Sequence, residues 1–240
     1  MEKAEGRDEK QGTRNKKQET RSKELETKGQ KLAPAATGRD NFLVTRLKQT
    51  LFNKLCLDAQ TCRVCPNLAD KTAVLSKLNG NLHPKVLFIG EAPGRAGADR
   101  TRRPFYGDKS GDNFQRLLDS IDLSRDDIFI TSAVLCSPRS LTDANRKPTR
   151  MEIRNCSFYL TRVLDVVQPS LIATLGVVGL EALSLIAYRE FQLKLHAGRV
   201  LDWNGLKLIP LYHPSPQVIA AQRGLDLQLR HFRSLAAFIK

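Results

Sequence analysis

Short apolar runs alternate with amphipathic stretches along residues 41–240. The apolar runs are rich in Val, Ile and Leu and end at turn residues, as buried strands do, whereas the amphipathic stretches place apolar residues three or four positions apart, as helices do. Strands are therefore predicted at residues 85–89, 127–135, 170–175 and 206–212. Helices are predicted at residues 41–56, 113–121, 149–167, 177–188 and 225–239.

The order of these elements predicts an α/β fold. Strands that alternate with helices form a parallel sheet covered on both faces, so we expect a four-stranded parallel sheet sandwiched between helices. Ligands of such sheets bind at the carboxyl ends of the strands. Three loops leave those ends, at residues 90–108, 136–149 and 213–224, and we expect the functional residues in these loops.

Two of the predicted helices carry further signals. The face that the first helix should bury consists of Val44, Leu47, Leu51 and Leu55. The helix predicted at residues 149–167 begins with Thr149 and Glu152, which have the S/T-x-x-E spacing of a capping box.

Residues 1–40 differ from the rest of the chain because they lack aromatic residues and apolar periodicity. Such a segment cannot bury enough apolar surface to fold, so we predict a disordered charged tail, followed by one domain at residues 41–240. The sequence contains no apolar core of an export signal and no run of about 18 apolar residues, the length that spans a membrane. We therefore expect a cytoplasmic protein that makes no contact with a membrane.

The chain carries a formal net charge of +14. Residues 1–40 contain 11 Lys and Arg against 8 Asp and Glu, a contribution of +3, so residues 41–240 carry +11. A basic domain favours a polyanionic partner, of which nucleic acid is the first candidate. A solvated basic surface that binds nothing is the alternative that charge alone leaves open.

The glycine-rich stretches match no nucleotide-binding fingerprint. GEAPGRAG, residues 90–97, lacks the G-x-G-x-x-G spacing, and LGVVG, residues 175–179, matches it only in part. The sequence has no Walker A lysine motif. Dinucleotide binding would therefore rest on the fold class alone.

The cysteines point to a metal site. Cys62 and Cys65 form a C-x-x-C pair, Cys136 ends the second predicted strand, and Cys156 lies in the helix that follows. Without an export signal a disulfide framework is not expected. A C-x-x-C pair and two distant cysteines can close one thiolate site, for zinc or for an iron–sulfur cluster. Alternatively, Cys136 and Cys156 are small buried hydrophobes, the role that we assign to Cys56.

Several motifs occur in an order that resembles one family. CRVCPNL is followed by VLFIGEAPG, RPFYGD, two further cysteines and YHPSP. This combination covers the chain from Cys62 to the C-terminus and resembles the iron–sulfur uracil-DNA glycosylases of families 4 and 5. The resemblance implies a monofunctional glycosylase that excises uracil from DNA. It also implies a 4Fe–4S cluster held by Cys62, Cys65, Cys136 and Cys156.

Base excision assigns roles to residues of the three loops. A base must be flipped out of the duplex and stacked on a ring, for which Phe105 is the matching platform, with Tyr106 beside it. Cleavage of the N-glycosidic bond leaves a cationic sugar and an anionic base, so the site needs a carboxylate and a hydrogen-bond donor. Asp108 and Glu91 are the candidate carboxylates, and His213 is the candidate donor.

The match combines features of both families. Glu91 and the HPSP stretch are typical of family 4, whereas the stretch that ends at Asp108 is typical of family 5. Family 4 reads uracil with an Asn at the position that Ser132 occupies here. We therefore favour Asp108 as the main carboxylate, and we expect hypoxanthine or xanthine to be accepted besides uracil.

Further residues of these loops are predicted to contact DNA. The backbone that would line the base pocket is that of Gly90, Ala92 and Pro93. The longer segment between the last two cysteines is basic and should grip DNA phosphates. Its candidate residues are Arg139, Arg146, Lys147 and Arg150. In the DNA-contacting loop after the fourth strand, Ser215 is predicted to stiffen the chain together with Pro214 and Pro216. Gln217, Val218 and Ile219 are predicted to enter the gap that the flipped base leaves.

Three functions remain open on the sequence. The first is a monomeric uracil-DNA glycosylase that acts on single- and double-stranded DNA. The second is a non-catalytic or weakly active iron–sulfur protein of the same fold that binds nucleic acid. The third is a small-molecule α/β enzyme with a structural zinc ion.

Overall fold

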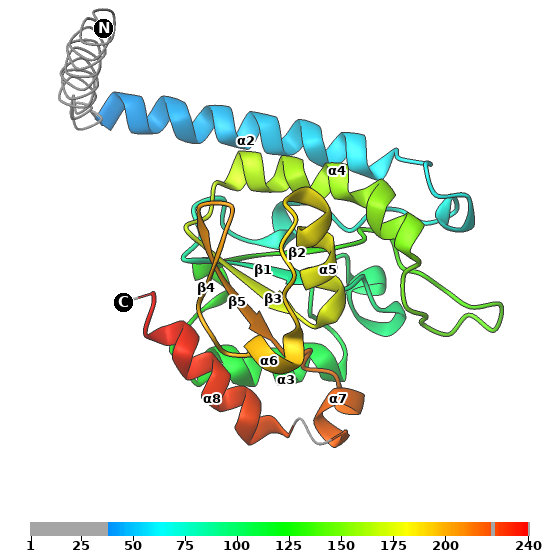
Figure 1. The fold of residues 1–240 in the computed structure, drawn as a ribbon. Helices are drawn as coiled ribbons and strands as arrows, with labels where there is room; N and C mark the ends of the chain where they lie inside the picture. Colours follow the sequence, from blue (N-terminus) through cyan, green and yellow to red (C-terminus); the bar gives the residue numbers. More distant parts are fainter. Residues whose placement is uncertain (1–37, 222–223, 240) are drawn as a thin grey trace, which may run out of the picture. The chain divides into compact units, whose positions relative to one another are not determined.

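The computed structural model describes residues 38–221 and 224–239. Within these residues, five strands form one sheet (Figure 1): β1 (Val86–Gly90), β2 (Ile128–Ser132), β3 (Leu171–Leu175), β4 (Leu201–Trp203) and β5 (Leu206–Leu211). Their order is β2-β1-β3-β5-β4; β4 pairs antiparallel with β5 and the other neighbours are parallel. The four predicted parallel strands are confirmed, and β4 is an additional edge strand that the sequence analysis missed.

Helices and helical turns connect these strands. The helices are α2 (Gly38–Gln60), α3 (Lys109–Asp119), α4 (Arg150–Val167), α5 (Val177–Ile186), α6 (Leu193–His196), α7 (Pro216–Ala220) and α8 (Leu225–Ala236). Shorter helical turns span Pro66–Leu68, Lys77–Asn79, Arg95–Asp99 and Arg125–Asp127. The five predicted helices are present with shifted ends, whereas α6 and α7 were not predicted.

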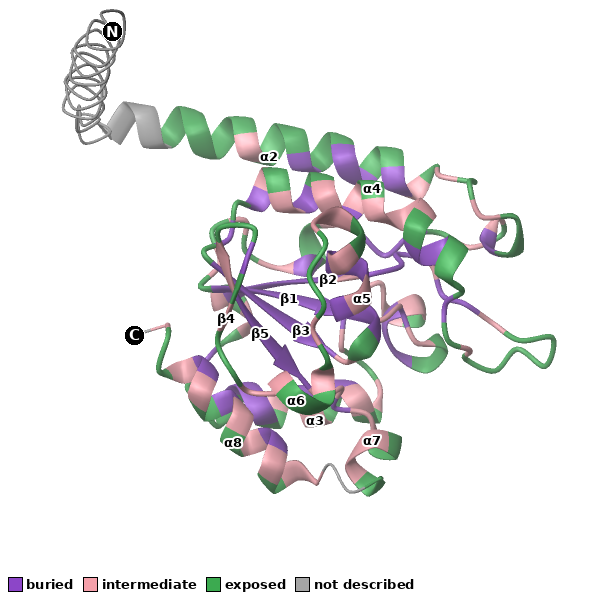
Figure 2. Cartoon of the chain, in the orientation of Figure 1, coloured by how far each residue is buried: buried purple, intermediate pink, exposed green. Residues whose placement is uncertain are grey.

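Two apolar layers hold the helices against the sheet, whose strands are largely buried (Figure 2). Successive strand residues point to opposite faces, so Leu87 and Ile89 belong to one layer and Val86 and Phe88 to the other. Residues of α2, α4 and α5 complete the first layer, and residues of α3 and α8 complete the second. The sheet is therefore sandwiched between helices, as predicted.

The buried side of α2 differs from the predicted one. Val44, Leu47 and Leu51 are exposed, so the prediction is wrong for these three residues. The residues of α2 that are buried are Phe52, Leu55, Cys56 and Ala59. The ring of Phe52 packs edge-on against Phe129 of β2, with ring centroids 5.5 Å apart. The helix therefore buries the face that carries the large Phe52 ring rather than the face that carries Val44, Leu47 and Leu51.

The start of α4 follows the prediction. The Thr149 side chain accepts a hydrogen bond from the Glu152 N–H, and the Glu152 carboxylate accepts one from the Thr149 N–H, which completes the capping box.

The predicted tail, residues 1–40, lies outside the described residues except for residues 38–40, which belong to α2. Among the described helices, none has the length and apolar character needed to cross a bilayer.

Candidate active site

A cavity of about 590 Å³ opens at the carboxyl end of the sheet, between the loops that follow β1, β2 and β5. The strand order reverses between β1 and β3, and open α/β sheets bind their ligands at such a point. The predicted site residues that line it are Glu91, Ala92, Pro93, Phe105, Asp108, Ser132, Arg146, Lys147, His213, Ser215 and Gln217. Most of the predicted site therefore comes together in one place.

Four predicted residues do not line this cavity: Gly90, Tyr106, Arg139 and Arg150. Gly90 lies directly under the platform, because an added Cβ would stand 3.0 Å from the Phe105 ring. Tyr106 is exposed, with the Arg103 guanidinium 4.7 Å from its ring centroid.

The basic residues after β2 mostly bind acids of their own chain. Arg139 forms ion pairs with Asp99 and Asp143. Arg146 makes a two-pronged contact with the buried Glu152, at 2.6 and 2.8 Å.

Arg150 is highly exposed and lies 3.7 Å from Glu181. The ion pairs of Arg139 and Arg146 brace the loop after β2, and the contact of these residues with DNA phosphates stays a prediction. Lys147 is exposed and faces the cavity.

Asp108 is held at the N-terminus of α3. Its side chain accepts a hydrogen bond from the Gly111 N–H at 2.9 Å and so caps the helix. Its second oxygen, Oδ2, rests against the backbone of the preceding loop, since a Cβ on Gly97 would come within 2.2 Å of it. The carboxylate is thereby fixed from two sides while it lines the cavity.

Phe105 is held in an unusual backbone conformation, with φ of 48°. The Arg125 guanidinium donates hydrogen bonds to the carbonyl oxygens of Pro104 and Phe105. Burial lowers the pKa of Arg125 to about 10, so it remains a cation at neutral pH. The Phe105 ring leans on Phe114, with centroids 4.9 Å apart. The platform is therefore rigid. No motif in the sequence pointed to the role of Arg125.

His213 is a neutral hydrogen-bond donor at physiological pH. Burial lowers its pKa to about 4, an effect that the negative charge of Asp108 opposes. The Ser215 N–H donates to Nδ1 at 3.2 Å, so Nδ1 is an acceptor and the proton resides on Nε2. The side chain of Asn113 on α3 holds the loop by donating to the Pro214 carbonyl oxygen.

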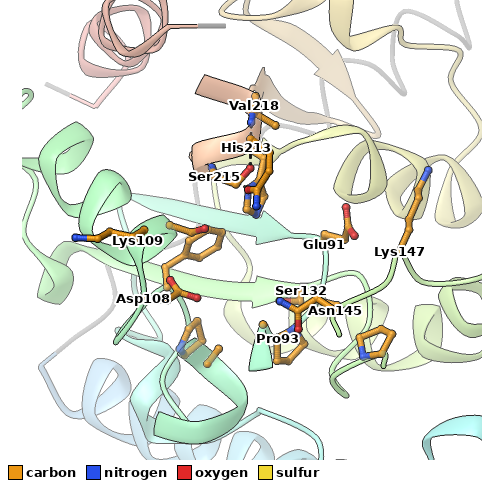
Figure 3. Close-up of a pocket in the computed structure, with 18 of the residues that line it drawn as sticks. Glu91, Pro93, Asp108, Lys109, Ser132, Asn145, Lys147, His213, Ser215 and Val218 are labelled. Carbon is orange, nitrogen blue, oxygen red and sulfur yellow. Dashed lines mark hydrogen bonds between the residues drawn. The ribbon is translucent and has the colours of Figure 1, made fainter. Parts of the chain in front are cut away.

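Glu91 lies on another side of the cavity from Asp108. Figure 3 shows Glu91 near Lys147, whereas Asp108 lies near Lys109. Burial raises the pKa of the Glu91 carboxyl above its ordinary value, and Lys147 partly offsets this shift.

Asn145 is a lining residue that the sequence analysis missed. Its side-chain oxygen accepts a hydrogen bond from the Arg95 N–H at 2.9 Å, so the loop after β2 is attached to the loop after β1. An Asn in a polar loop is ordinary in sequence, and only the fold reveals that it reaches the cavity.

The four predicted cluster cysteines form a second candidate site. Burial, together with the charges of Cys62 and Cys65, raises the pKa of Cys136 to about 11. Cys156 also interacts electrostatically with the other three thiols. The Leu135 N–H donates to Cys156 Sγ at 3.3 Å.

The side chain of Asn155 donates to Cys65 Sγ at 3.5 Å. The four thiols are thus brought near one another from separate segments. As the described side chains stand, no three Cys, His, Asp or Glu residues are disposed to hold a single metal ion.

Comparison with known proteins fits this geometry. Residues 79–237 match the family model of the uracil DNA glycosylase superfamily, and the chain belongs to this superfamily. The resemblance drawn from the sequence is thereby confirmed.

Relatives of two types are found. The type-4 uracil-DNA glycosylase of Thermotoga maritima is 32% identical over 155 residues, 64% of this chain and 76% of the relative. The type-5 uracil-DNA glycosylase of Pyrobaculum aerophilum is 31% identical over 183 residues, 65% of this chain and 78% of the relative. Similarity to both types agrees with the mixture of motifs in the sequence.

Proposed function

We propose that this chain is a monofunctional DNA glycosylase that flips uracil out of DNA and hydrolyses its N-glycosidic bond. The observation that carries this proposal is the placement of three side chains around one cavity. They are the rigid Phe105 platform, the Nε2–H of neutral His213 and the anchored Asp108 carboxylate. Superfamily membership and relatives named as uracil-DNA glycosylases support the same activity.

The flipped base stacks on Phe105 in the proposed reaction. As the C1′–N1 bond breaks, its electron pair passes to the base and negative charge develops on a base carbonyl oxygen. His213 donates its Nε2–H to that oxygen and stabilises the leaving group. Because His213 is neutral, it needs no proton from solvent to act as this donor at pH 7.

The sugar becomes cationic at the same time, and the Asp108 carboxylate stabilises this charge. A water molecule then bonds to C1′ through its oxygen, and its proton passes to a carboxylate of the site, in our proposal Asp108. The products are free uracil and an abasic site. A lyase step that cuts the strand is not part of the proposal.

The four cysteines would hold a 4Fe–4S cluster. In such a cluster each thiolate binds a different iron, so the sulfurs stand farther apart than around one zinc ion with bonds of about 2.3 Å. The electrostatic interaction of Cys156 with Cys136, Cys65 and Cys62 supports this set of four ligands. When bound, the cluster would cross-link the segment after α2 to the loop after β2 and to α4, and it would supply no group to the excision.

Paired cysteine variants test the cluster. Cys62→Ser should lose iron and the brown colour of the purified protein, because one thiolate ligand is removed. Cys56→Ser, a change at a buried cysteine in the core of α2, should keep both. Full iron content in Cys62→Ser, measured by metal analysis, would refute the assignment.

Incubation of the purified chain with a uracil-bearing oligonucleotide, followed by alkali, tests the activity. Alkali cuts DNA at abasic sites, so excision yields a shortened strand, whereas a thymine-bearing control stays intact. Binding to the oligonucleotide without cleavage after alkali would favour the non-catalytic alternative. Monomeric state and residence in the cytoplasm stay predictions.

A further inference from the structure

Two residues of the loop after β1 have a backbone conformation that residues other than glycine rarely adopt. Phe105, the proposed base platform, has a φ of 48°, and Arg102, which precedes it in the same loop, has a φ of 59°. A glycine would adopt this conformation without strain, whereas the Cβ of Arg102 makes it unfavourable. Such a conformation persists only where surrounding contacts hold it, so the contacts of Arg102 indicate what it serves.

The Arg102 side chain reaches from this loop to residues 66–74, which follow the C-x-x-C pair and which we call the 66–74 segment. Its Nη2 donates hydrogen bonds to the carbonyl oxygens of Ala73 at 2.6 Å and Thr72 at 3.0 Å. Its Nη1 lies 3.4 Å from the carboxylate of Asp99 in its own loop. The guanidinium therefore joins two segments that are distant in the chain, and its planar fork of donors suits such simultaneous contacts.

The 66–74 segment lies between two of the predicted cluster cysteines. It follows Cys65 directly in the chain. At its other end, the Val74 N–H donates to the carbonyl oxygen of Leu135 at 2.7 Å, and Leu135 immediately precedes Cys136. The segment is therefore attached at both ends to residues beside the expected ligands, so its position depends on the order of the four-cysteine site.

The other end of this connection is the Phe105 platform. Only two residues, one of them Pro104, separate Phe105 from Arg102. The Arg125 guanidinium already fixes the carbonyl oxygens of Pro104 and Phe105. A short stretch that includes the restricted φ of a proline has few torsions that could absorb a displacement of Arg102. A shift of Arg102 should therefore move the ring.

We propose that Arg102 is a positioning residue that connects the base platform to the four-cysteine site. This inference rests on the proposed function, in which the flipped base stacks on Phe105. Order at the four cysteines would keep the 66–74 segment in place, and the segment would hold Arg102 and so the platform. The positive charge of Arg102 also lowers the pKa of Cys136 against the larger effect of burial, which shows that the two groups interact. Because such coupling acts in both directions, loss of the Arg102 contacts should loosen both ends.

Arg102→Gly tests the connection without straining the backbone, because glycine accepts the positive φ while the guanidinium is lost. Hydrogen exchange is measured by mass spectrometry on the purified, iron-loaded chain without DNA. We expect faster exchange at residues 103–107 and in the 66–74 segment, and unchanged exchange in the strands of the sheet. Unchanged exchange at residues 103–107 would overturn the proposal. A rise spread evenly over the sheet would do the same, because it would mark a general loss of stability.

Iron release gives a second measurement that needs no substrate. Loss of the brown colour to a chelator should be about fivefold faster in Arg102→Gly, because the 66–74 segment opens more often. Arg102→Lys keeps the charge but offers one ammonium to two carbonyl oxygens and a carboxylate, so its release rate should be intermediate. Arg103→Ala is the matched control, since Arg103 packs over the Tyr106 ring, and it should change neither exchange nor iron release. Equal release from Arg102→Gly and the unchanged chain would contradict the connection.

Excision kinetics relate the connection to base binding. Stacking on Phe105 holds the flipped base before and during bond cleavage, so Arg102→Gly should raise KM about fivefold and change kcat less than about twofold. Arg103→Ala loses the same charge, so an equal rise of KM in both variants would show that charge rather than position is responsible and would overturn the proposal. A lowered kcat with unchanged KM would overturn it as well. Absence of excision by the unchanged chain would instead refute the proposed function, while exchange and iron release would still test the connection.

Discussion

Asp108 and Glu91 line the same cavity but are held in different ways. Asp108 caps α3 through the Gly111 N–H and rests with Oδ2 against the backbone at Gly97. Glu91 follows the end of β1, where burial raises the pKa of its carboxyl and only the exposed Lys147 opposes that effect. One carboxylate is fixed in place by the chain, and the other is biased toward its neutral form.

This difference bears on which carboxylate stabilises a sugar cation. Electrostatic stabilisation is most effective when a charge is already oriented before the transition state forms. The supports of Asp108 are backbone groups, which do not reorient during the reaction. Burial disfavours the charged form of Glu91, so its ionisation costs more free energy than that of a solvated carboxyl. The comparison therefore favours Asp108, in agreement with the preference drawn from the sequence.

Asp108→Asn should have the largest effect of the changes considered. The amide keeps the shape and size of the carboxylate but removes its charge, so we expect the single-turnover rate of uracil excision to fall by roughly 10² or more. Thermal unfolding should reveal any loss of helix capping separately. The ranking of the two carboxylates would be reversed if Asp108→Asn retained the full rate while Glu91→Gln was inactive.

Gly97→Ala should have the next largest effect, because it displaces the Asp108 carboxylate without removing its charge. The added Cβ would stand 2.2 Å from Asp108 Oδ2, so the carboxylate must shift. A misplacement of this kind should cost roughly tenfold or more in rate. Gly94→Ala is the matched control, since its Cβ would stand 3.4 Å from the same oxygen, at the edge of ordinary contact. Equal rates in the two variants would show that the position of Asp108 is not critical.

Glu91→Gln should lower the excision rate less than tenfold but should alter stability in a pH-dependent way. Because the pKa of Glu91 is raised in the folded chain, its contribution to stability is present at low pH and is lost as pH rises through that pKa. Gln carries no charge at any pH. The variant should therefore melt at about the same temperature as the unchanged chain at pH 4 and at a higher temperature at pH 8. A melting temperature lowered at pH 8 would mean that the ionised carboxylate is favourably bound.

The sequence predicted the elements of this site better than their supports. Apolar runs placed β1, β2, β3 and β5, and the topology of an α/β sheet then placed Glu91, Ser132 and His213 at one edge. Sequence motifs identified Asp108 and Phe105 as site residues. They did not reveal that Asp108 caps the N-terminus of α3 or that Arg125 holds the Phe105 backbone. Such contacts join residues distant in the sequence, and local pattern carries no information on them.

Charge in the sequence does not reveal which basic residues form ion pairs within the fold. Arg139 and Arg146 are as basic in sequence as Lys147, yet their partners Asp99, Asp143 and Glu152 neutralise them in the fold. The buried side of α2 was misplaced, since a periodic aliphatic stripe does not reveal that one aromatic ring finds a partner in the sheet. The error at α2 arises where a tertiary contact overrides a local signal.

Ser132→Asn should have the smallest effect on uracil and a clear effect on specificity. Ser132 lies at the end of β2 opposite Gly90, so its side chain lines the cavity close to the platform. A hydroxyl makes one contact at a time, whereas an amide offers a donor and an acceptor together and can read both polar groups on one edge of uracil. The ratio of uracil to hypoxanthine excision should therefore rise about fivefold or more, with uracil excision itself little changed.

A second variant at Ser132 distinguishes the effect of side-chain size from the effect of hydrogen bonding to the base. Leu has nearly the shape of Asn but no polar group, so Ser132→Leu fills the same space without reading the base. If the amide is responsible, Ser132→Leu should lower excision of both bases and leave their ratio near that of the unchanged chain. If Ser132→Leu raises the ratio as much as Ser132→Asn, size alone sets the base range. The small Ser132 side chain would then admit larger bases because it leaves space beside Gly90. Bond cleavage at Asp108 would not depend on which base is bound.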